Sequence, residues 1–315
     1  MTKKPVFVGI DTSNYTTSIA VSDTDGNIVL NLKKLLDVKE GERGLRQSDA
    51  VFAHVKNISM LSNELNSAIN GCKIVGIGVS VTPRDAEGSY MPCFLVGKSI
   101  ADTLSATHNA PVYYFSHQSG HIMAALYSSG QADTLIDKDF IAFHVSGGTT
   151  EALLVKPHGE GFNVELIAET VDISAGQAID RAGVMMGLKF PCGKEMERLA
   201  SEFTGSLPMP KICVRNGRIN LSGLENISQK LYNETSDSHY VSAYVLNFIS
   251  KTLIKITQDV RENHGDLPIL YAGGVMSNKY LQGELSKFKS TYFAAPEYST
   301  DNAAGVALLA RRKHK

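Results

Sequence analysis

Two segments of the chain, one in each half, share the same order of expected elements. The first covers residues 6–30 and the second covers residues 140–167. Each begins with an apolar run typical of a buried strand, followed by a polar turn, a second strand, a glycine-containing turn and a third strand. In both copies the polar turn directly follows the first strand, where backbone N–H groups are able to face a phosphate. The repeat predicts two lobes, each with a hairpin-bearing sheet.

Helices and further strands alternate between and after these segments, which places the chain in the α/β class. Apolar residues recur at helical spacing over 49–69 and 240–260, and a last helix is expected over 300–312. The architecture that matches is a duplicated actin-like or sugar-kinase-like (ribonuclease H-like) two-lobed fold, with a nucleotide and metal cleft between the lobes. The N-terminal lobe is expected over residues 1–135 and the C-terminal lobe over 136–315.

Composition excludes several classes of protein. The chain has 315 residues, of which 43% are hydrophobic and 20% charged, and this balance is ordinary for a globular protein. A formal net charge of −1 gives no overall basic field of the kind that announces a nucleic-acid partner, although a local patch would still suffice. No apolar run approaches the roughly 20 residues that span a bilayer, and the first is too short for a signal peptide. We therefore expect a cytoplasmic protein with no membrane contact.

A pair of histidines, His117 and His121, lies four residues apart at the start of an expected helix. Residues at this spacing project from one helix face, and two neutral imidazoles so placed are a common ligand pair for zinc or iron. In isolation, surface or core histidines are the commoner explanation. The zinc-protease motif needs a glutamate directly after the first histidine, but Gln118 cannot take a proton, which argues against proteolysis.

A glycine-rich turn, Val145-Ser146-Gly147-Gly148-Thr149, follows the first strand of the second triplet. Adjacent glycines permit close backbone approach to a ligand, and the hydroxyls can donate to a phosphate, although Gly-Gly also forms plain hairpin turns.

Three other positions carry polar groups suited to a nucleotide or a metal. Asp180, on an expected helix, suits a ribose, or an ion pair with a neighbouring cation. Gly273-Gly274 ends a strand and suits the adenosine side of a nucleotide cleft. Asp301 is a carboxylate at a helix start, where an ordinary N-cap is the alternative.

In this order, the segments resemble the TsaD family, the tRNA threonylcarbamoyl-adenosine synthases once labelled glycoproteases. The resemblance extends from Val8 to about Ala310. It rests on seven ordered matches: Gly-Ile-Asp-Thr-Ser (9–13) to GIETS, His117-x-x-x-His121 to HxExH, Val-Ser-Gly-Gly (145–148) to VSGGH, Ala-Gly-x-Ala-x-Asp with Gly-Leu and Pro-x-Gly (175–193) to AGEAFDK…GL…YPGG, Ser-Gly-Leu (222–224) to SGL, Gly-Gly-Val-x-x-Asn (273–278) to GGVxxN, and Thr-Asp-Asn-Ala-Ala (300–304) to TDNAA.

The resemblance implies a site and a reaction. His117, His121 and Asp301 would bind one divalent metal, iron or zinc. The adenine nucleotide (threonylcarbamoyl-adenylate, AMP or ATP) would be bound by Val145, Ser146, Gly147, Gly148, Thr149, Asp180, Gly193, Glu197 and Asn278. The implied reaction is metal-dependent transfer of the threonylcarbamoyl group to the adenosine beside the tRNA anticodon. The implied partners are tRNA and a related actin-like protein of the TsaB type, which the helical face near 49–69 could meet.

Four departures from the family pattern lie around the expected cleft. The family's Glu in HxExH is Ser119, its His in VSGGH is Thr149, and its Glu in AGEAFD is Gln177. The glycine-rich loop after the strand at 75–81 has become the longer and charged segment 82–88. All three metal ligands are retained.

Several functions are consistent with this pattern. The leading prediction is a metal-dependent acyltransferase acting on tRNA, or a close relative with an altered substrate. The alternative is a non-catalytic nucleotide- and metal-binding paralogue that acts as a scaffold for a partner protein. A phosphotransferase of the sugar-kinase kind shares the fold but leaves the two histidines unexplained.

Overall fold

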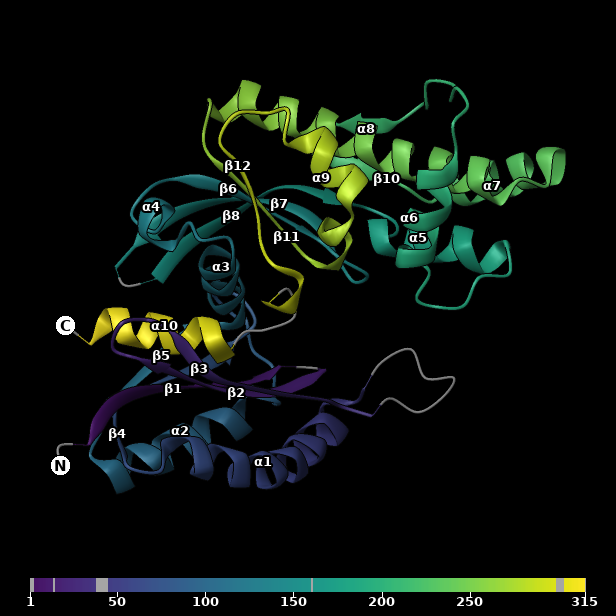
Figure 1. Ribbon diagram of the computed structural model, residues 1–315. Helices are drawn as coiled ribbons and strands as arrows, with labels where there is room; N and C mark the ends of the chain where they lie inside the picture. The colour runs from purple at the N-terminus through teal and green to yellow at the C-terminus, as the bar shows by residue number, and fades with distance from the viewer. Residues whose placement is uncertain (1–2, 14, 38–44, 160, 299–302, 315) are drawn as a thin grey trace. The chain divides into compact units, whose positions relative to one another are not determined.

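The computed structural model describes residues 3–13, 15–37, 45–159, 161–298 and 303–314 (Figure 1). The chain divides into two compact units. The first unit comprises Met1–Ser128, Pro157–Asn163 and Thr300–Lys315, and the second comprises Ser129–Lys156 and Val164–Ser299.

The first unit is built on a five-stranded sheet with the order β3-β2-β1-β4-β5. The central strand β1 pairs antiparallel with β2 and parallel with β4, and β4 pairs parallel with β5. Both faces of β1 are buried, which explains its nearly continuous apolar run. The strands are β1 (Lys4–Ser13), β2 (Thr16–Asp23), β3 (Ile28–Leu35), β4 (Cys72–Thr82) and β5 (Val112–Ser116).

Helices cover both faces of this sheet, α1 and α2 on one face and α10 on the other (Figure 1). Gly9 and Gly78 are register partners on β1 and β4, and side chains there would collide with the backbone and alanines of α10. The missing side chains let α10 lie directly on the strands, which is why that helix is rich in alanine. The helices are α1 (Gln47–Ile69), α2 (Phe94–His108), α3 (His117–Ser128) and α10 (Ala303–Lys313).

Helix α10 also packs against α3. A Cβ at Gly305 would meet the backbone of Gly120, so the two helices approach at backbone distance. The expected C-terminal helix is confirmed from Ala303 onward, whereas Thr300, Asp301 and Asn302 lie outside the described residues. A lobe boundary after residue 135 would assign α10 to the second lobe, but this helix belongs to the first unit.

The second unit is built on a seven-stranded sheet with the order β12-β11-β6-β7-β8-β10-β9. Five of its strands, β8-β7-β6-β11-β12, repeat the order β3-β2-β1-β4-β5, so the predicted duplication in an α/β fold is confirmed. The strands are β6 (Phe140–Val145), β7 (Thr150–His158), β8 (Gly161–Thr170), β9 (Cys213–Arg215), β10 (Arg218–Asn220), β11 (Ile269–Ala272) and β12 (Thr291–Phe293).

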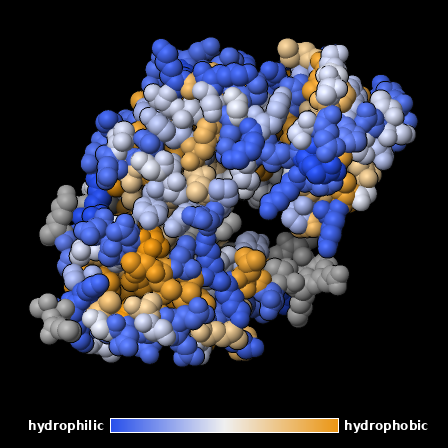
Figure 2. Space-filling view, in the orientation of Figure 1, coloured by the Kyte–Doolittle hydropathy of each residue, from blue (hydrophilic) through white to orange (hydrophobic). Residues whose placement is uncertain are grey.

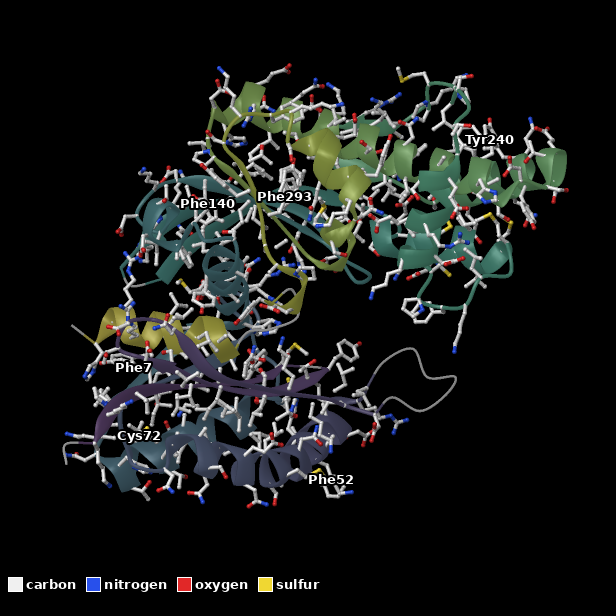
Figure 3. All side chains as sticks on the ribbon, viewed as in Figure 1. Phe7, Phe52, Cys72, Phe140, Tyr240 and Phe293 are labelled. Carbon is white, nitrogen blue, oxygen red and sulfur yellow. The ribbon has the colours of Figure 1, made fainter. Side chains whose placement is uncertain are left out.

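The second core forms between this sheet and the long helix α8. The rings of Phe143, Tyr271 and Phe293 stack across β6, β11 and β12 with centroid separations of 4.7 and 5.5 Å. Figure 3 labels Phe140 and Phe293 on this sheet. The helices are α4 (Ala132–Leu135), α5 (Ala175–Met185), α6 (Gly193–Glu202), α7 (Gly223–Thr235), α8 (Ser238–His264) and α9 (Lys279–Leu285), with 3-10 turns η1 (Gly274–Ser277) and η2 (Pro296–Tyr298).

The surface in the view of Figure 2 is mostly hydrophilic, and hydrophobic residues gather chiefly over the area where Figure 1 labels β3, β5 and α10. Among the helices in the described ranges, none combines the length and the hydropathy needed to cross a membrane.

Candidate metal and nucleotide sites

The carboxyl end of β1 bears a buried carboxylate. Asp11 has no exposed surface, and its Oδ1 atom accepts a hydrogen bond of 2.9 Å from the Ser13 backbone N–H. Burial raises the pKa of Asp11, but the neighbouring His117 ring and the hydrogen bonds from His117 and Ser13 outweigh it and hold the pKa below its ordinary value. Asp11 is therefore an ionised acceptor at the carboxyl end of β1.

This carboxylate fixes the orientation of His117. Asp11 Oδ2 lies 2.9 Å from His117 Nδ1, and because an ionised carboxylate can only accept, Nδ1 must carry the hydrogen. In the neutral ring the lone pair then resides on Nε2. The His117 side chain is 23% exposed, so the ring that carries the Nε2 lone pair is partly accessible to a ligand. A carboxylate behind a histidine is the usual arrangement around a metal-binding imidazole.

The second histidine lies one turn further along α3. The His117 and His121 rings are 4.6 Å apart between centroids and inclined at 73°. Within the described ranges no third His, Cys, Asp or Glu joins them in a metal-binding group. Asp301, the third predicted ligand, lies outside the described residues. The donor types and the orientation of His117 fit a divalent metal, and the three-ligand site stays a prediction.

A second buried polar network joins β2 to α1. The Asn57 amide donates to the Thr17 hydroxyl (3.1 Å), which lies 2.8 Å from His54 Nδ1. Burial lowers the pKa of His54, against the opposing influence of the Ser13 backbone and the Asp11 charge. A neutral His54 ties α1 to β2, the strand that pairs with the end of β1 bearing Asp11.

In the second unit, the turn after β6 leaves its two glycines on the surface. Gly147 and Gly148 are exposed, and a Cβ on either would meet open space or the Ser146 hydroxyl at 3.9 Å. The Ser146 hydroxyl accepts hydrogen bonds from the backbone N–H groups of Gly148 (3.2 Å) and Thr149 (3.1 Å), which holds the turn in shape. The backbone here is open to a ligand, as the sequence predicted for a phosphate loop.

The start of α5 buttresses this turn. The Gly176 N–H donates to the Ser146 carbonyl (3.1 Å), and the Ser174 hydroxyl donates to the Gly147 carbonyl (2.8 Å). A Cβ at Gly176 would lie 2.6 Å from Gly147 Cα, so only glycine permits this approach.

The departure at Thr149 has its own partner. The Thr149 hydroxyl lies 3.0 Å from Nδ1 of His144, a ring that is also 3.9 Å from Oε1 of Glu151. The chain thus places a histidine ring beside the position where the family pattern has a histidine, but from the preceding strand β6. The side chain of Gln177, the third substituted position, is exposed.

The other predicted nucleotide ligands connect α5, α6 and α9. Asp180 Oδ1 on α5 accepts from the Cys192 N–H (2.7 Å) directly before Gly193, the first residue of α6. Glu197 Oε1 on α6 accepts from the Lys279 N–H (2.6 Å), the first residue of α9. Adjacent to it, Asn278 caps α9 by accepting from the Leu281 N–H (3.0 Å).

Gly273 brings the segment before α9 close to the turn after β6. Its φ of 103° is in the region that favours glycine, and a Cβ there would lie 2.9 Å from the Val145 backbone nitrogen. The second unit therefore brings together the turn at 145–149, α5, α6 and the start of α9. That these residues bind a nucleotide remains a prediction.

A pocket of about 440 Å³ opens beside Glu197 and Lys279. This size and its largely apolar lining suit one side of a small-molecule site. The lining residues are Glu197, Ala200, Ser201, Phe203, Gly205, Leu207, Ala243, Leu246, Lys279 and Tyr280.

Sequence reasoning did not single out two residues near the histidines. Asp11 could have been found as an acidic residue that continues the apolar run of residues 6–10, because a buried carboxylate requires a partner. Asp85, which contacts the start of α3, belongs to the charged segment 82–88 and carries no signal apart from its charge.

Comparisons with known proteins match nearly the whole chain. A family model described as tRNA N6-adenosine threonylcarbamoyltransferase (TsaD) matches residues 30–308. Curated proteins of that name from Bacillus licheniformis and Francisella philomiragia are 30% and 27% identical to this chain. The Bacillus match covers 97% of this chain and 91% of the relative, and the Francisella match covers 96% and 92%.

Solved structures that resemble the chain share the fold at low sequence identity. Component A of the (R)-2-hydroxyglutaryl-CoA dehydratase of Acidaminococcus fermentans is 15% identical with a TM-score of 0.55, and 98% of each chain is covered. A ROK family glucokinase from Streptomyces griseus, in complex with glucose and AMPPNP, is 12% identical with a TM-score of 0.51, covering 97% of this chain and 98% of that chain. The predicted actin-like, sugar-kinase-like α/β fold is thus confirmed.

Proposed function

The chain belongs to the TsaD family of tRNA N6-adenosine threonylcarbamoyltransferases, and from this membership we propose that it transfers a threonylcarbamoyl group to the adenosine beside the tRNA anticodon. The observation that carries the proposal is the family match over residues 30–308, which includes every predicted metal and nucleotide ligand. The hydrogen bond from His117 to the buried Asp11 supports it, because it orients one predicted ligand before any metal binds.

The proposed substrate is threonylcarbamoyl-adenylate. The N6 amine of the tRNA adenosine forms a bond to the carbamoyl carbon, and the bond from that carbon to the phosphate oxygen breaks. The electron pair leaves with AMP, and the amine proton passes to solvent. A divalent metal bound by His117, His121 and Asp301 would polarise the threonylcarbamoyl group as a Lewis acid.

The second unit supplies the proposed nucleotide contacts. The exposed glycines at 147 and 148 allow the phosphate to approach the backbone beside the N-terminus of α5. Glu197 and Asn278 flank the start of α9, beside the apolar pocket, where the adenosine would bind. Substrate tRNA, a cytoplasmic location and a TsaB-type partner are parts of the same proposal.

A non-catalytic scaffold is the second candidate. The observation that favours it is the contact between Thr149 and His144, which engages the hydroxyl inside the turn. Ser119 and Gln177 likewise replace two glutamates of the family pattern. A scaffold of this kind would still bind nucleotide and metal.

Complementation separates the two functions. The chain is expressed in cells depleted of their own TsaD, and digested tRNA is analysed by mass spectrometry for the threonylcarbamoylated adenosine. We expect the modified nucleoside to return with the unmutated chain and to stay absent with the His117→Ala/His121→Ala double variant. No modification by a folded chain that binds AMP would reject the acyltransferase and favour the scaffold.

A further inference from the structure

Two of the departures from the family pattern contact each other in the first unit. Asp85, in the charged segment that replaces the family's glycine-rich loop, lies against the first turn of α3. Its Oδ2 atom accepts hydrogen bonds from the hydroxyls of Ser116 (2.5 Å) and Ser119 (2.9 Å). Ser119 occupies the position of the family's glutamate. The residue that lost a carboxylate therefore contacts a carboxylate from another segment.

The contact lies at the helix end that bears the predicted metal ligands. Because α3 begins at His117, Ser119 is its third residue and Ser116 is its N-cap. The Ser116 hydroxyl accepts from the Ser119 N–H (3.1 Å), and the Pro83 carbonyl accepts from the Gln118 N–H (3.1 Å). The segment 82–88 and the N-cap thus satisfy backbone groups that a helix start leaves unpaired.

A glutamate at position 119 would be at the third helical residue. There a glutamate completes a capping box with an N-cap serine, and a negative charge interacts favourably with the helix dipole. With Ser119 the chain retains the N-cap and lacks the charge on α3 itself. Asp85 brings a carboxylate to the same turn from the loop after β4.

We propose that Asp85 replaces the missing glutamate as the positioning carboxylate of α3, and so holds the His117–His121 pair in the geometry that binds metal. The inference rests on the metal site of the proposed function. His117 is the first residue of α3, so fraying of the first turn would move it relative to His121 and disturb its hydrogen bond to Asp11. Both serine hydroxyls are buried, and loss of Asp85 would leave them without this acceptor.

Because both carboxylates would occupy one turn, the proposal predicts that Ser119→Glu acts in opposite directions in two backgrounds. Beside Asp85, the new glutamate places two like charges together and displaces the loop. In Asp85→Ala, the same glutamate restores the capping box and the charge. A role of Asp85 in loop folding alone would not produce this reversal.

The test is Co²⁺ binding. Affinity is measured by titration, and the visible absorption of the bound ion reports its coordination geometry. The proteins are the unmutated chain, Asp85→Ala, Ser119→Glu, and the double variants Asp85→Ala/Ser119→Glu and Asp85→Ala/Ser119→Gln. Glu87→Gln, an exposed acid in the same loop, is the matched control. Hydrogen exchange of the amides of residues 117–121 provides a second reading on each protein.

We expect Asp85→Ala and Ser119→Glu each to weaken Co²⁺ binding by about tenfold, the effect typical of residues that orient a metal ligand. Asp85→Ala/Ser119→Glu should recover most of the affinity, the glutamine variant less, and Glu87→Gln should bind as the unmutated chain does. Hydrogen exchange of the amides in the first turn of α3 should be faster in Asp85→Ala and Ser119→Glu. It should return toward the rate of the unmutated chain in Asp85→Ala/Ser119→Glu.

Unchanged affinity in Asp85→Ala, or a double variant no better than Asp85→Ala, would overturn the proposal, as would an unmutated chain that binds no metal. If the affinities follow the expected order and the chain modifies no tRNA, the acyltransferase function fails and the role of Asp85 stands.

Discussion

The carboxyl end of β1 and the turn after β6 occupy corresponding places in two sheets that share a strand order, yet their residues act differently. At the end of β1, Asp11 is fully buried and engaged by Ser13 and His117. In the turn after β6, Gly147 and Gly148 are exposed, and the surrounding hydrogen bonds maintain the turn without covering it.

The difference shows how one element order can serve two purposes. A carboxylate near the end of β1 fixes a side chain of the protein, whereas glycines after β6 leave backbone accessible to a ligand. If this division is correct, substitutions around the end of β1 should affect metal binding alone, and substitutions around the turn after β6 should affect nucleotide binding alone.

The largest effect is expected from removal of both histidines. His117→Ala/His121→Ala should lower bound zinc or iron from about one equivalent to none, because two of the three predicted ligands are lost. Metal content of the purified protein is measured by mass spectrometry, with the exposed His108→Ala as the control that retains metal. Binding of AMP, measured by calorimetry, should be unchanged. Metal retained in the double variant would reject the site.

The next effect is expected at Asp11. Asp11→Asn removes the ionised acceptor that keeps the hydrogen on His117 Nδ1, so metal affinity should fall by about 10- to 100-fold. The comparison is with Asp23→Asn, a carboxylate in the same unit that stabilises a hairpin turn and should leave metal affinity unchanged. Equal affinities in the two variants would show that Asp11 does not orient the ligand.

Gly176 tests whether the turn after β6 binds nucleotide. In Gly176→Ala the new methyl group would lie 2.6 Å from Gly147 Cα and 2.7 Å from the Ser146 carbonyl oxygen, so the backbone must shift. A shift costing about 1–2 kcal/mol should weaken AMP binding by about tenfold, with metal content intact. Gly283→Ala, in a helix position with open space, is the control and should bind AMP normally. If Gly176→Ala also lost its metal, metal binding and nucleotide binding would not be separate properties of the two strand ends.

Much of the fold could be predicted because its signals are local. The triplets around residues 6–30 and 140–167 imply sheets, because short apolar runs separated by polar and glycine-containing turns are typical of strands joined by hairpins. The place of α10 could not be predicted in this way. It depends on Gly9 and Gly78 being register partners, a relation between strands that periodicity along the chain does not contain.

The site was predictable to a smaller extent. The histidine pair and the glycine turn follow from spacing and from the family pattern, and both are on the expected elements. The contact of Asp85 with Ser119 joins two departures that the sequence analysis treated separately, and the contact of Thr149 with His144 involves a histidine that it did not single out. Asn278 was expected to contact nucleotide, and the structure shows its side-chain oxygen capping α9.

The smallest effect is expected at Asp172. This residue secures the segment that leads to Ser174, and it therefore supports the turn after β6 only indirectly. Burial raises the pKa of Asp172, but hydrogen bonds from Leu221, Ser222 and Ile173 outweigh it and lower the pKa to about 2. Because the folded pKa lies below the ordinary 3.8, the contribution to stability is complete above about pH 4 and is lost as the pH falls toward 2.

Asp172→Asn should therefore lower the free energy of unfolding at neutral pH by about 1 kcal/mol, a value reduced by solvent screening of this exposed carboxylate. The difference from the unmutated chain, measured by urea unfolding from pH 7 to 2.5, should shrink below pH 4. Glu165→Gln, an exposed acid in the same unit, should show no comparable difference. Since Ser174 and Gly176 still hold the turn after β6, AMP affinity should change little, and a large loss of affinity would mean that this turn depends directly on Asp172.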